Sequence, residues 1–319
     1  MRILITGATG LVGSEIVRLC HEQNIDVNYL TTSKNKIVSK TNYQGYYWNP
    51  DTGEIDQNSF KGVSAIINLA GASISKRWTT SYKKIVLSSR INALRTLKNA
   101  LEQIDTSGIR SFISASAIGI YPNSLATFYT EDEKNVDDSF LGEVVAIWEK
   151  EADVFEKFDF AVAKIRIGLV ISAAGGALPE MAKPIKYYAG AAFGNGMHWQ
   201  SWIHISDLAR QFLYLIEHRL EGTYNGVGPN PVNNAKLVKE IAKVIDRPLF
   251  LPNIPRFVMK AILGEMSYLL FASQRVSSKK IEEEGFVFHY PNICRALENI
   301  YSKETTKSKF NSVAKKEYI

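Results

Sequence analysis

The chain is poor in cysteine and has no long apolar run. Its 319 residues include two cysteines, Cys20 and Cys294, whose positions match no metal-ligand spacing. We therefore expect reduced thiols and no metal site. The longest apolar runs, such as residues 64–70, are far too short to cross a bilayer, and the N-terminus does not resemble a signal peptide. These absences predict a cytoplasmic protein that does not bind membranes.

Positive charge is concentrated at the C-terminal end of the chain. The net charge is +6, and five lysines against two glutamates give residues 302–319 a charge of +3. That segment is polar and without pattern, which is typical of a flexible basic tail. A basic stripe interleaved with aromatic residues is absent, so nucleic acid is not an expected partner. We expect a small-molecule substrate and a monomer or a homodimer.

A strand-like run at residues 2–5 leads directly into a glycine-rich turn and then an amphipathic helix. This arrangement presents backbone N–H groups and a helix N-terminus to a diphosphate. Gly7 lets the strand turn sharply, Gly10 lets the backbone approach the phosphates, and Gly13 lets the helix pack on the sheet. The alternative is a tight structural turn without a ligand. The expected cofactor contacts here are Gly7, Thr9, Gly10, Leu11, Val12 and Gly13.

An acidic residue is missing at the end of the second predicted strand, residues 27–32. An Asp or Glu at this point would bind the ribose 2′-hydroxyl of NAD. The residues found there carry hydroxyl groups and an ammonium group, and they are Thr31, Thr32, Ser33 and Lys34. Such groups suit a 2′-phosphate, so we expect NADP(H) to be favoured over NAD(H). The alternative is a solvated polar loop with no ribose contact.

Short apolar strands alternate with helical segments through the first two-thirds of the chain. The expected elements are strands at 64–69, 110–116 and 160–166, and helices at 79–103 and 140–156. This rhythm predicts the α/β class, with a doubly wound parallel sheet of the Rossmann type. The expected domains are a Rossmann domain over 1–250, which includes a substrate lobe at about 171–250, and a small helical C-terminal module over 251–300.

Three segments resemble motifs of the extended short-chain dehydrogenase/reductase superfamily. They are Thr-Gly-Ala-Thr-Gly-Leu-Val-Gly at 6–13, Asn-Leu-Ala-Gly at 68–71 and Trp-Ile-His-Ile-Ser-Asp-Leu-Ala at 202–209. Other segments resemble the subgroup labelled epimerase family protein, which ends in a domain of unknown function; they are 76–78, 88–92, 114–119, 148–149 and 263–286. The resemblance implies an NADP(H)-binding oxidoreductase, or an enzyme similar to nucleoside-diphosphate-sugar epimerases, with an unknown small substrate. It also implies cofactor contacts from Leu69, Ala70, Gly71, Asn92 and Ser114.

Enzymes of this superfamily usually use a Ser or Thr together with a Tyr-x-x-x-Lys pair, whose lysine lowers the tyrosine pKa. No tyrosine of this chain has a lysine four residues on, and residues 140–151, where the pair belongs, contain no tyrosine. Ser116 matches the catalytic serine, Asn92 matches the asparagine of a water relay, and Tyr121 is a candidate substitute acid. The alternatives are a local backbone bond for Ser116, packing for Tyr121 and an ordinary helix position for Asn92.

Three side chains are expected to contact a substrate, namely Arg77, Trp78 and Trp202. For Arg77 and Trp78 the alternative is a solvated basic helix. The missing Tyr-x-x-x-Lys pair also leaves a second functional hypothesis open. In that hypothesis the chain is a sensor or scaffold that binds NADP(H) without turnover.

Overall fold

A mostly parallel sheet forms the centre of the computed structural model, which describes residues 1–302. Its strands are β1 (Arg2–Thr6), β2 (Asp26–Thr31), β3 (Ser39–Lys40), β4 (Tyr43–Asn49), β5 (Glu54–Ile55), β6 (Ala65–Asn68), β7 (Ser111–Ala117), β9 (Ala161–Ile167) and β13 (Gly222–Gly226). Their order is β13-β9-β7-β6-β1-β2-β4-β3, and β5 pairs with β4. The short strands β3 and β5 run antiparallel to β4, whereas the other neighbours are parallel.

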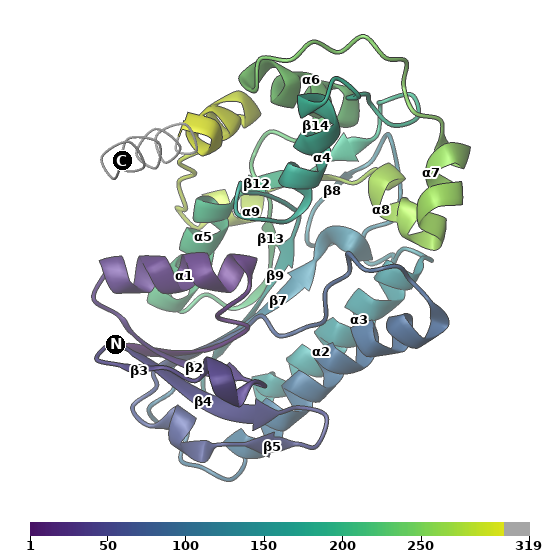
Figure 1. Cartoon of the computed structure of the whole chain (residues 1–319). Coiled ribbons are helices and arrows are strands. Elements are labelled where there is room, and N and C mark those ends of the chain that lie inside the picture. Colours follow the sequence, from purple (N-terminus) through teal and green to yellow (C-terminus); the bar gives the residue numbers. More distant parts are fainter. Residues whose placement is uncertain (303–319) are drawn as a thin grey trace, which may run out of the picture.

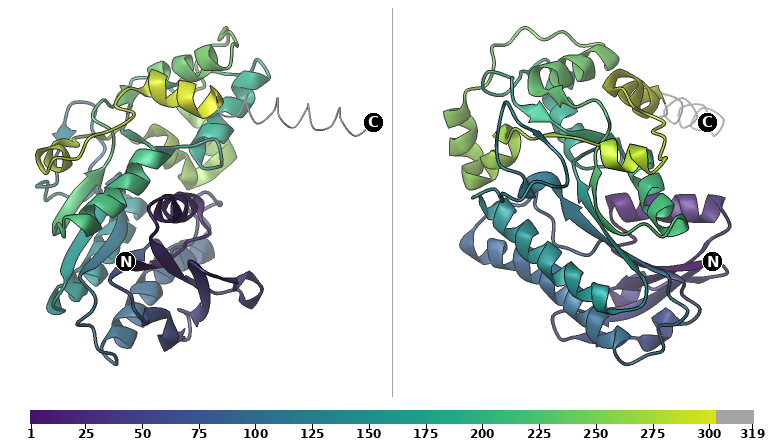
Figure 2. Two further views of the ribbon diagram at one scale, coloured as in Figure 1. Left: turned by 90° about the vertical axis from the view of Figure 1, so that its left-hand side faces the viewer. Right: turned by 180° about the vertical axis from the view of Figure 1, so that it is seen from behind.

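Four helices cover the two faces of this sheet. On one face α1 (Leu11–Glu22) packs against α5 (Ile205–Glu217), and on the other α2 (Thr80–Leu101) packs against α3 (Phe140–Asp153), as Figure 1 and Figure 2 show. Each helix buries one side; in α5 that side includes Leu208, Phe212 and Leu215, at the spacing of an apolar helix face. Because both sheet faces are covered, central strands such as β1 are buried almost throughout. The predicted doubly wound α/β fold is confirmed.

The chain changes direction across the sheet at β1. It moves outward through β2 and β4 and then returns to β6 on the other side of β1. Open α/β sheets bind ligands at such a reversal, outside the carboxyl ends of the strands. The turns that follow β1 and β6 therefore border the same crevice.

The sequence predicts a small hairpin with a strand at 46–48 and a turn at 50–53, but it does not predict that this strand extends over the whole of β4 and pairs in parallel with β2. The seven residues of β4 are mostly half-buried and include three tyrosines, so the strand shows no clean alternation of apolar and polar residues. It is set by tertiary contacts instead, because Tyr43 stacks on Tyr29 of β2 with ring centroids 4.3 Å apart. The register places Tyr47 opposite Thr31.

A second group of elements follows the main sheet, and its members are β10 (Leu169–Ile171), α4 (Ala177–Lys186), β11 (Trp199–Gln200), β12 (Trp202–His204), β14 (Val232–Asn233) and α6 (Asn234–Val244). They enclose their own apolar core, which includes Leu178, Ile185 and Leu237. Although α5 and β13 also lie within the expected lobe of 171–250, they belong to the main sheet and its helix layer. The lobe is therefore discontinuous in the sequence.

The C-terminal segment packs into the rest of the fold. Its elements are α7 (Arg256–Leu263), α8 (Tyr268–Phe271), β15 (Arg275–Val276) and α9 (Lys279–Glu283), and its partner strand earlier in the chain is β8 (Phe128–Tyr129). Strand β15 pairs in parallel with β8. The buried carboxylate of Asp207 in α5 accepts hydrogen bonds from the backbone N–H groups of His289 and Tyr290. A helix that begins at residue 293 adds Ile293 and Leu297 to the core around α4 and α6. Residues 251–300 thus share their cores with the preceding chain.

None of the helices within residues 1–302 has the length and apolar character that crossing a bilayer requires. The same part of the chain holds no group of three or more His, Cys, Asp or Glu side chains placed to bind a metal ion. The basic tail predicted for 302–319 lies, from residue 303 on, outside the described residues.

Candidate cofactor and substrate site

The glycine turn after β1 has the backbone geometry that the sequence predicts. Gly7 has a φ of 69°, in the left-handed region that favours glycine, and its carbonyl accepts the N–H of Gly10 at 2.9 Å. A Cβ atom on Gly13 would lie 2.2 Å from the Gly7 carbonyl oxygen. Both glycines are therefore required for the close packing of helix α1 on the turn.

The N-terminus of α1 is open to a ligand. Its N-cap residue is Gly10, which supplies no side-chain hydrogen bond, and the first turn contains no acidic residue. The first N–H groups of a helix need acceptors and carry partial positive charge, so this end favours an anion. Thr9 is exposed beside it, while Leu11 and Val12 are half-buried. The residues predicted at 7–13 thus form one turn, which we call the cradle, whose backbone N–H groups and helix N-terminus are the features that bind phosphate groups.

The turn after β6 lies against the glycine turn. Thr6 at the end of β1 donates a hydrogen bond to Asn68 and accepts the N–H groups of Leu69 and Ala70, at 2.8, 3.0 and 3.1 Å. The structure therefore brings residues 69–71 to the crevice. Ser114 is different, because its side chain is fully buried and accepts a hydrogen bond from Asn68. Ser114 therefore links the ends of β6 and β7 inside the sheet and is not accessible from the crevice.

The end of β2 carries the residues predicted to select the cofactor. Thr31 is buried and accepts the N–H of Ser33 at 3.2 Å, whereas Thr32 and Lys34 are exposed. The Lys34 ammonium lies 4.9 Å from the centroid of the Tyr47 ring. Within residues 1–302 no carboxylate forms an ion pair with Lys34, so its charge is available to a ligand.

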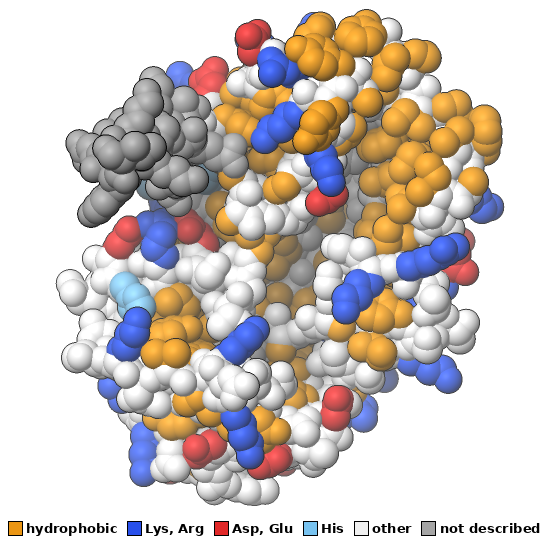
Figure 3. Space-filling view, in the orientation of Figure 1, with side chains coloured by type: hydrophobic (Ala, Val, Ile, Leu, Met, Phe, Trp, Pro, Cys, Tyr) orange, Lys and Arg blue, Asp and Glu red, His pale blue; other side chains and the backbone are white. Residues whose placement is uncertain are grey.

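A cavity of about 220 Å³ lies next to the C-terminal ends of β7 and β9. Figure 3 shows a hollow near the middle of the molecule, with hydrophobic side chains inside it. Helix α3 faces the cavity with the apolar residues Leu141, Val144, Val145 and Trp148. The side of α3 that faces the cavity is therefore apolar, within the segment where the resemblance implies a Tyr-x-x-x-Lys pair.

Ser116 and Tyr121 do not line this cavity; Ala117 and Gly119 do. The Ser116 hydroxyl donates to Glu149 at 2.6 Å, and the Tyr121 hydroxyl donates to Asn225 at 2.7 Å. Both side chains are almost completely buried. Burial raises the pKa of Tyr121 to about 12, so this phenol keeps its proton.

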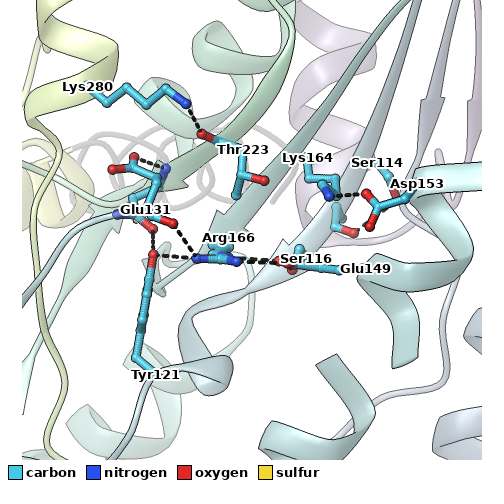
Figure 4. Close-up of polar contacts among 12 residues, drawn as sticks. Ser114, Ser116, Tyr121, Glu131, Glu149, Asp153, Lys164, Arg166, Thr223 and Lys280 are labelled. Carbon is cyan, nitrogen blue, oxygen red and sulfur yellow. Dashed lines mark hydrogen bonds and ion pairs between the residues drawn. The ribbon is translucent and has the colours of Figure 1, made fainter. Parts of the chain in front are cut away.

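Arg166 joins these two residues into one buried network, which Figure 4 shows. It donates two hydrogen bonds of 2.8 Å to Glu149 and one of 2.9 Å to the Tyr121 hydroxyl. Burial alone would raise the pKa of Glu149, but the hydrogen bonds and charge of Arg166 lower it below its usual value. Ser116 and Arg166 are cross-strand partners in β7 and β9, which explains how the network forms.

Two other predicted residues, Asn92 and Trp202, also lie outside the cavity lining. Asn92 points away from it and donates to Asp51 at 3.1 Å. Trp202 is fully buried in the core of the lobe and donates to the carbonyl of Asn230. Its predicted contact with substrate is wrong, because no part of its surface is accessible; Trp199 lines the cavity instead.

The remaining substrate prediction concerns the segment before α2. Arg77 is exposed, and Trp78 is buried against Phe140 with ring centroids 5.3 Å apart. The indole N–H of Trp78 donates to the carbonyl of Ile74, a residue that lines the cavity. Trp78 therefore packs behind the cavity wall and holds Ile74 in place, without lining the cavity itself.

Comparison with known proteins agrees with this architecture. The model described as "NAD dependent epimerase/dehydratase family" matches residues 3–227. The chain belongs to this family. A second model, a domain of unknown function named DUF1731, matches residues 254–300, which include α7, α8, β15 and α9.

Full-length relatives of this epimerase family have the same extent as this chain. Epimerase family protein SERP0438 of Staphylococcus epidermidis is 36% identical over 304 residues, which cover 94% of this chain and 98% of the relative. Epimerase family protein YfhF of Bacillus subtilis is 35% identical over 307 residues, with 96% and 100% covered. The crystal structure of human epimerase family protein SDR39U1 (isoform 2) with NADPH has a TM-score of 0.82 at 25% identity, and 94% of this chain and 99% of that chain are covered.

Several polar residues of the cavity lining are not among the sequence predictions, and they are Arg90, Tyr268, Gln200, Ser201 and Gln274. Arg90 reaches the cavity from α2, and Tyr268 reaches it from α8 in the segment of unknown function. In the sequence Arg90 is one of several basic residues on α2, and only its half-buried position distinguishes it from exposed neighbours such as Arg95. For Tyr268 the sequence offers no signal, because it lies far along the chain from the other lining residues.

Proposed function

We propose that the chain is an NADP(H)-dependent oxidoreductase that acts on a small substrate. The observation that carries this proposal is the position of the open N-terminus of α1 and of the apolar cavity at the same edge of one parallel sheet. The cavity of about 220 Å³ is small and mostly apolar, which favours a small molecule over a nucleotide sugar. The NADPH in the human relative's structure supports the choice of cofactor.

The residues that would hold the cofactor follow from the geometry. The N-terminus of α1 and the glycine turn would bind the diphosphate, and Lys34 with the hydroxyls of Thr32 and Ser33 would bind the 2′-phosphate. Residues 69–71 would border the ribose on the β6 side. When bound, NADPH supplies the hydride that reduces a carbonyl carbon.

The proton for such a reduction is proposed to come from Tyr268. This residue lines the cavity, and its hydroxyl donates to both carboxylate oxygens of Asp137 at 2.8 Å. Burial and the bond to Asp137 raise the pKa of Tyr268 above its ordinary value, so this phenol, like Tyr121, keeps its proton at neutral pH until a stronger base, such as an alkoxide forming at the carbonyl oxygen, accepts it. As the carbonyl carbon accepts the hydride, Tyr268 would give its proton to the carbonyl oxygen. Ser116 would act as a positioning residue, because its contact with Glu149 orders the wall that contains Ala117.

Cofactor choice is tested by fluorescence titration of the purified protein with NADPH and NADH. We expect NADPH to bind at least about tenfold more tightly, because one charge-assisted hydrogen bond contributes about 1.5–3 kcal/mol. Lys34→Ala should remove most of that difference, while Lys61→Ala, an exposed control, should keep it. Equal affinities of the unchanged protein for the two cofactors would contradict the assignment.

Turnover is tested by loss of NADPH absorbance in the presence of aldehydes, ketones and quinones. Tyr268→Phe should abolish turnover and leave NADPH affinity unchanged, whereas Tyr187→Phe on the exposed surface should change neither. Turnover by the Tyr268 variant at the original rate would remove Tyr268 from the reaction.

The apolar cavity face of α3 favours a second function, an NADP(H)-binding sensor or scaffold without turnover. Such a protein would bind NADPH with the same preference, because the cradle is independent of the cavity. It would oxidise NADPH with none of the carbonyl compounds. The two assays together therefore separate the two functions.

A further inference from the structure

Arg90 places a half-buried positive charge at the wall of the cavity. Its guanidinium lies 4.9 Å from the centroid of the Trp148 ring, so it stacks on an aromatic side chain that also lines the cavity. One nitrogen donates to the backbone carbonyls of Ala72 and Val86, at 3.2 and 2.8 Å. These contacts fix the position of the guanidinium and leave its other nitrogens without protein acceptors.

The charge of Arg90 has no counterion in the part of the chain that the structure describes. No carboxylate within residues 1–302 forms an ion pair with it, and its Nε atom is buried without a hydrogen-bond partner. Burial lowers the pKa of Arg90 to about 10, so it remains a cation at neutral pH at a cost in desolvation. Buried charges are normally paired, and an unpaired guanidinium beside a cavity is complementary to a ligand anion.

We propose that Arg90 binds the carboxylate of a small substrate whose aromatic or aliphatic body fills the rest of the cavity. The proposal rests on the proposed function, and it names the class of substrate for that site. Most of the remaining lining is apolar and includes Ile74, Leu141, Val144 and Leu269, while Gln200, Ser201, Gln274 and Tyr268 add uncharged polar groups. They provide contacts for a hydrocarbon body and no second cation, so one end of the ligand is anionic and the other is apolar.

The segment that leads into α2 supports an anionic substrate. Residues 76–84 contain four basic side chains and no acidic one, and they are Lys76, Arg77, Lys83 and Lys84. This segment lies between Ile74, which lines the cavity, and the helix that carries Arg90. Positive charge beside a binding site attracts anions and speeds their association. Lys83 is paired with Glu265, whereas the other three basic side chains form no ion pair within residues 1–302, so residues 76–84 keep a net positive charge.

The test is calorimetric binding of benzoate, 2-naphthoate and indole-3-acetate, each compared with its uncharged amide, to the full chain saturated with NADPH. We expect at least one carboxylate to bind about tenfold or more tightly than its amide, as charge-assisted hydrogen bonds imply. Arg90→Met should remove this preference and keep the weaker amide binding. Arg90→Lys should restore part of it, and Arg95→Met, an exposed control on the same helix, should change nothing.

Two results would overturn the proposal. One is a wild-type chain that binds no carboxylate more tightly than its amide, or none at all. The other is an Arg90→Met variant that folds, as judged by its unfolding temperature, but still prefers the carboxylate to the amide. The proposal is overturned in the same way if this variant loses only its affinity for NADPH, because Arg90 would then belong to the cofactor site. The same titrations without NADPH keep the test independent of the proposed function, since carboxylate binding is measured even if NADPH does not bind.

Discussion

Replacing Glu149 with glutamine removes the negative charge from the buried network behind the cavity. The Glu149 carboxylate accepts two hydrogen bonds from Arg166 and one from Ser116, and the side chains of the ion pair are each only 9% exposed. Glutamine has one acceptor oxygen in place of two, so Arg166 keeps its charge without a counterion. Removal of one partner from a buried ion pair costs about 3–5 kcal/mol. That cost corresponds to a drop in Tm of roughly 6 °C or more for a domain of this size.

The measurement is urea unfolding at neutral pH, followed by circular dichroism. Glu151→Gln is the matched control, because Glu151 lies two residues away on α3 and pairs with Arg95, which is 61% exposed. An exposed pair contributes about 0–1 kcal/mol, so this variant should unfold almost like the original protein. The reasoning fails if the two variants lose the same free energy of unfolding.

The pH dependence of the same pair has a definite sign. The folded-state pKa of Glu149 lies below its unfolded value, so its stabilising contribution is present above the unfolded pKa and is lost as the pH falls through the folded pKa. Between neutral and acidic pH, the free energy of unfolding should therefore fall less for Glu149→Gln than for the original protein. NADPH affinity should stay unchanged, since none of the network residues lies in the glycine turn.

Three further predictions concern other parts of the fold. Gly13→Ala should weaken NADPH binding by about tenfold or more, because its Cβ would overlap the Gly7 carbonyl; Gly108→Ala, with no atom nearer than 3.8 Å, is the control in the same titration. Burial and the nearby charge of Arg256 lower the pKa of His198 to about 4. Between about pH 6.5 and pH 4, His198 is protonated in the unfolded chain but not in the folded protein, so the free energy of unfolding should fall as the pH falls through this range. In thermal melts, His198→Gln should show a weaker dependence of Tm on pH. Once a substrate is found, Ser116→Ala should keep turnover within a few-fold of the original, because its hydroxyl does not reach the cavity; complete loss would return Ser116 to a direct role.

The sequence was sufficient for the parts of the fold that depend on local pattern. The glycine turn needs three small residues at fixed spacing between a strand and a helix, and all three conditions lie within residues 2–14. The helix predicted at 79–103 is observed as α2, and the strand predicted at 110–116 as β7. The small hairpin predicted around residues 46–53 is observed as β4 and β5, but the parallel pairing of β4 with β2 has no signal in its irregular mixture of tyrosine and polar residues.

Contacts between distant residues account for the errors at the candidate site. Ser116 was expected at the reacting centre, but its position in the β7–β9 register turns it toward Arg166 and Glu149. Trp202 was expected to touch substrate, yet it is completely buried in the lobe. Both outcomes depend on which side of a strand faces a helix, and no local pattern in these segments specifies that.

The sequence by itself determined an α/β fold and a cradle for a dinucleotide, because backbone conformation and helix dipoles follow from neighbouring residues. The tertiary structure decided which side chains meet in the cavity. It brought Arg90 from α2 and Tyr268 from α8 to one wall and left Ser116 behind it. Burial gives these groups their chemistry, since an arginine on a solvated helix and an arginine beside an apolar cavity differ only in the water and charges around them.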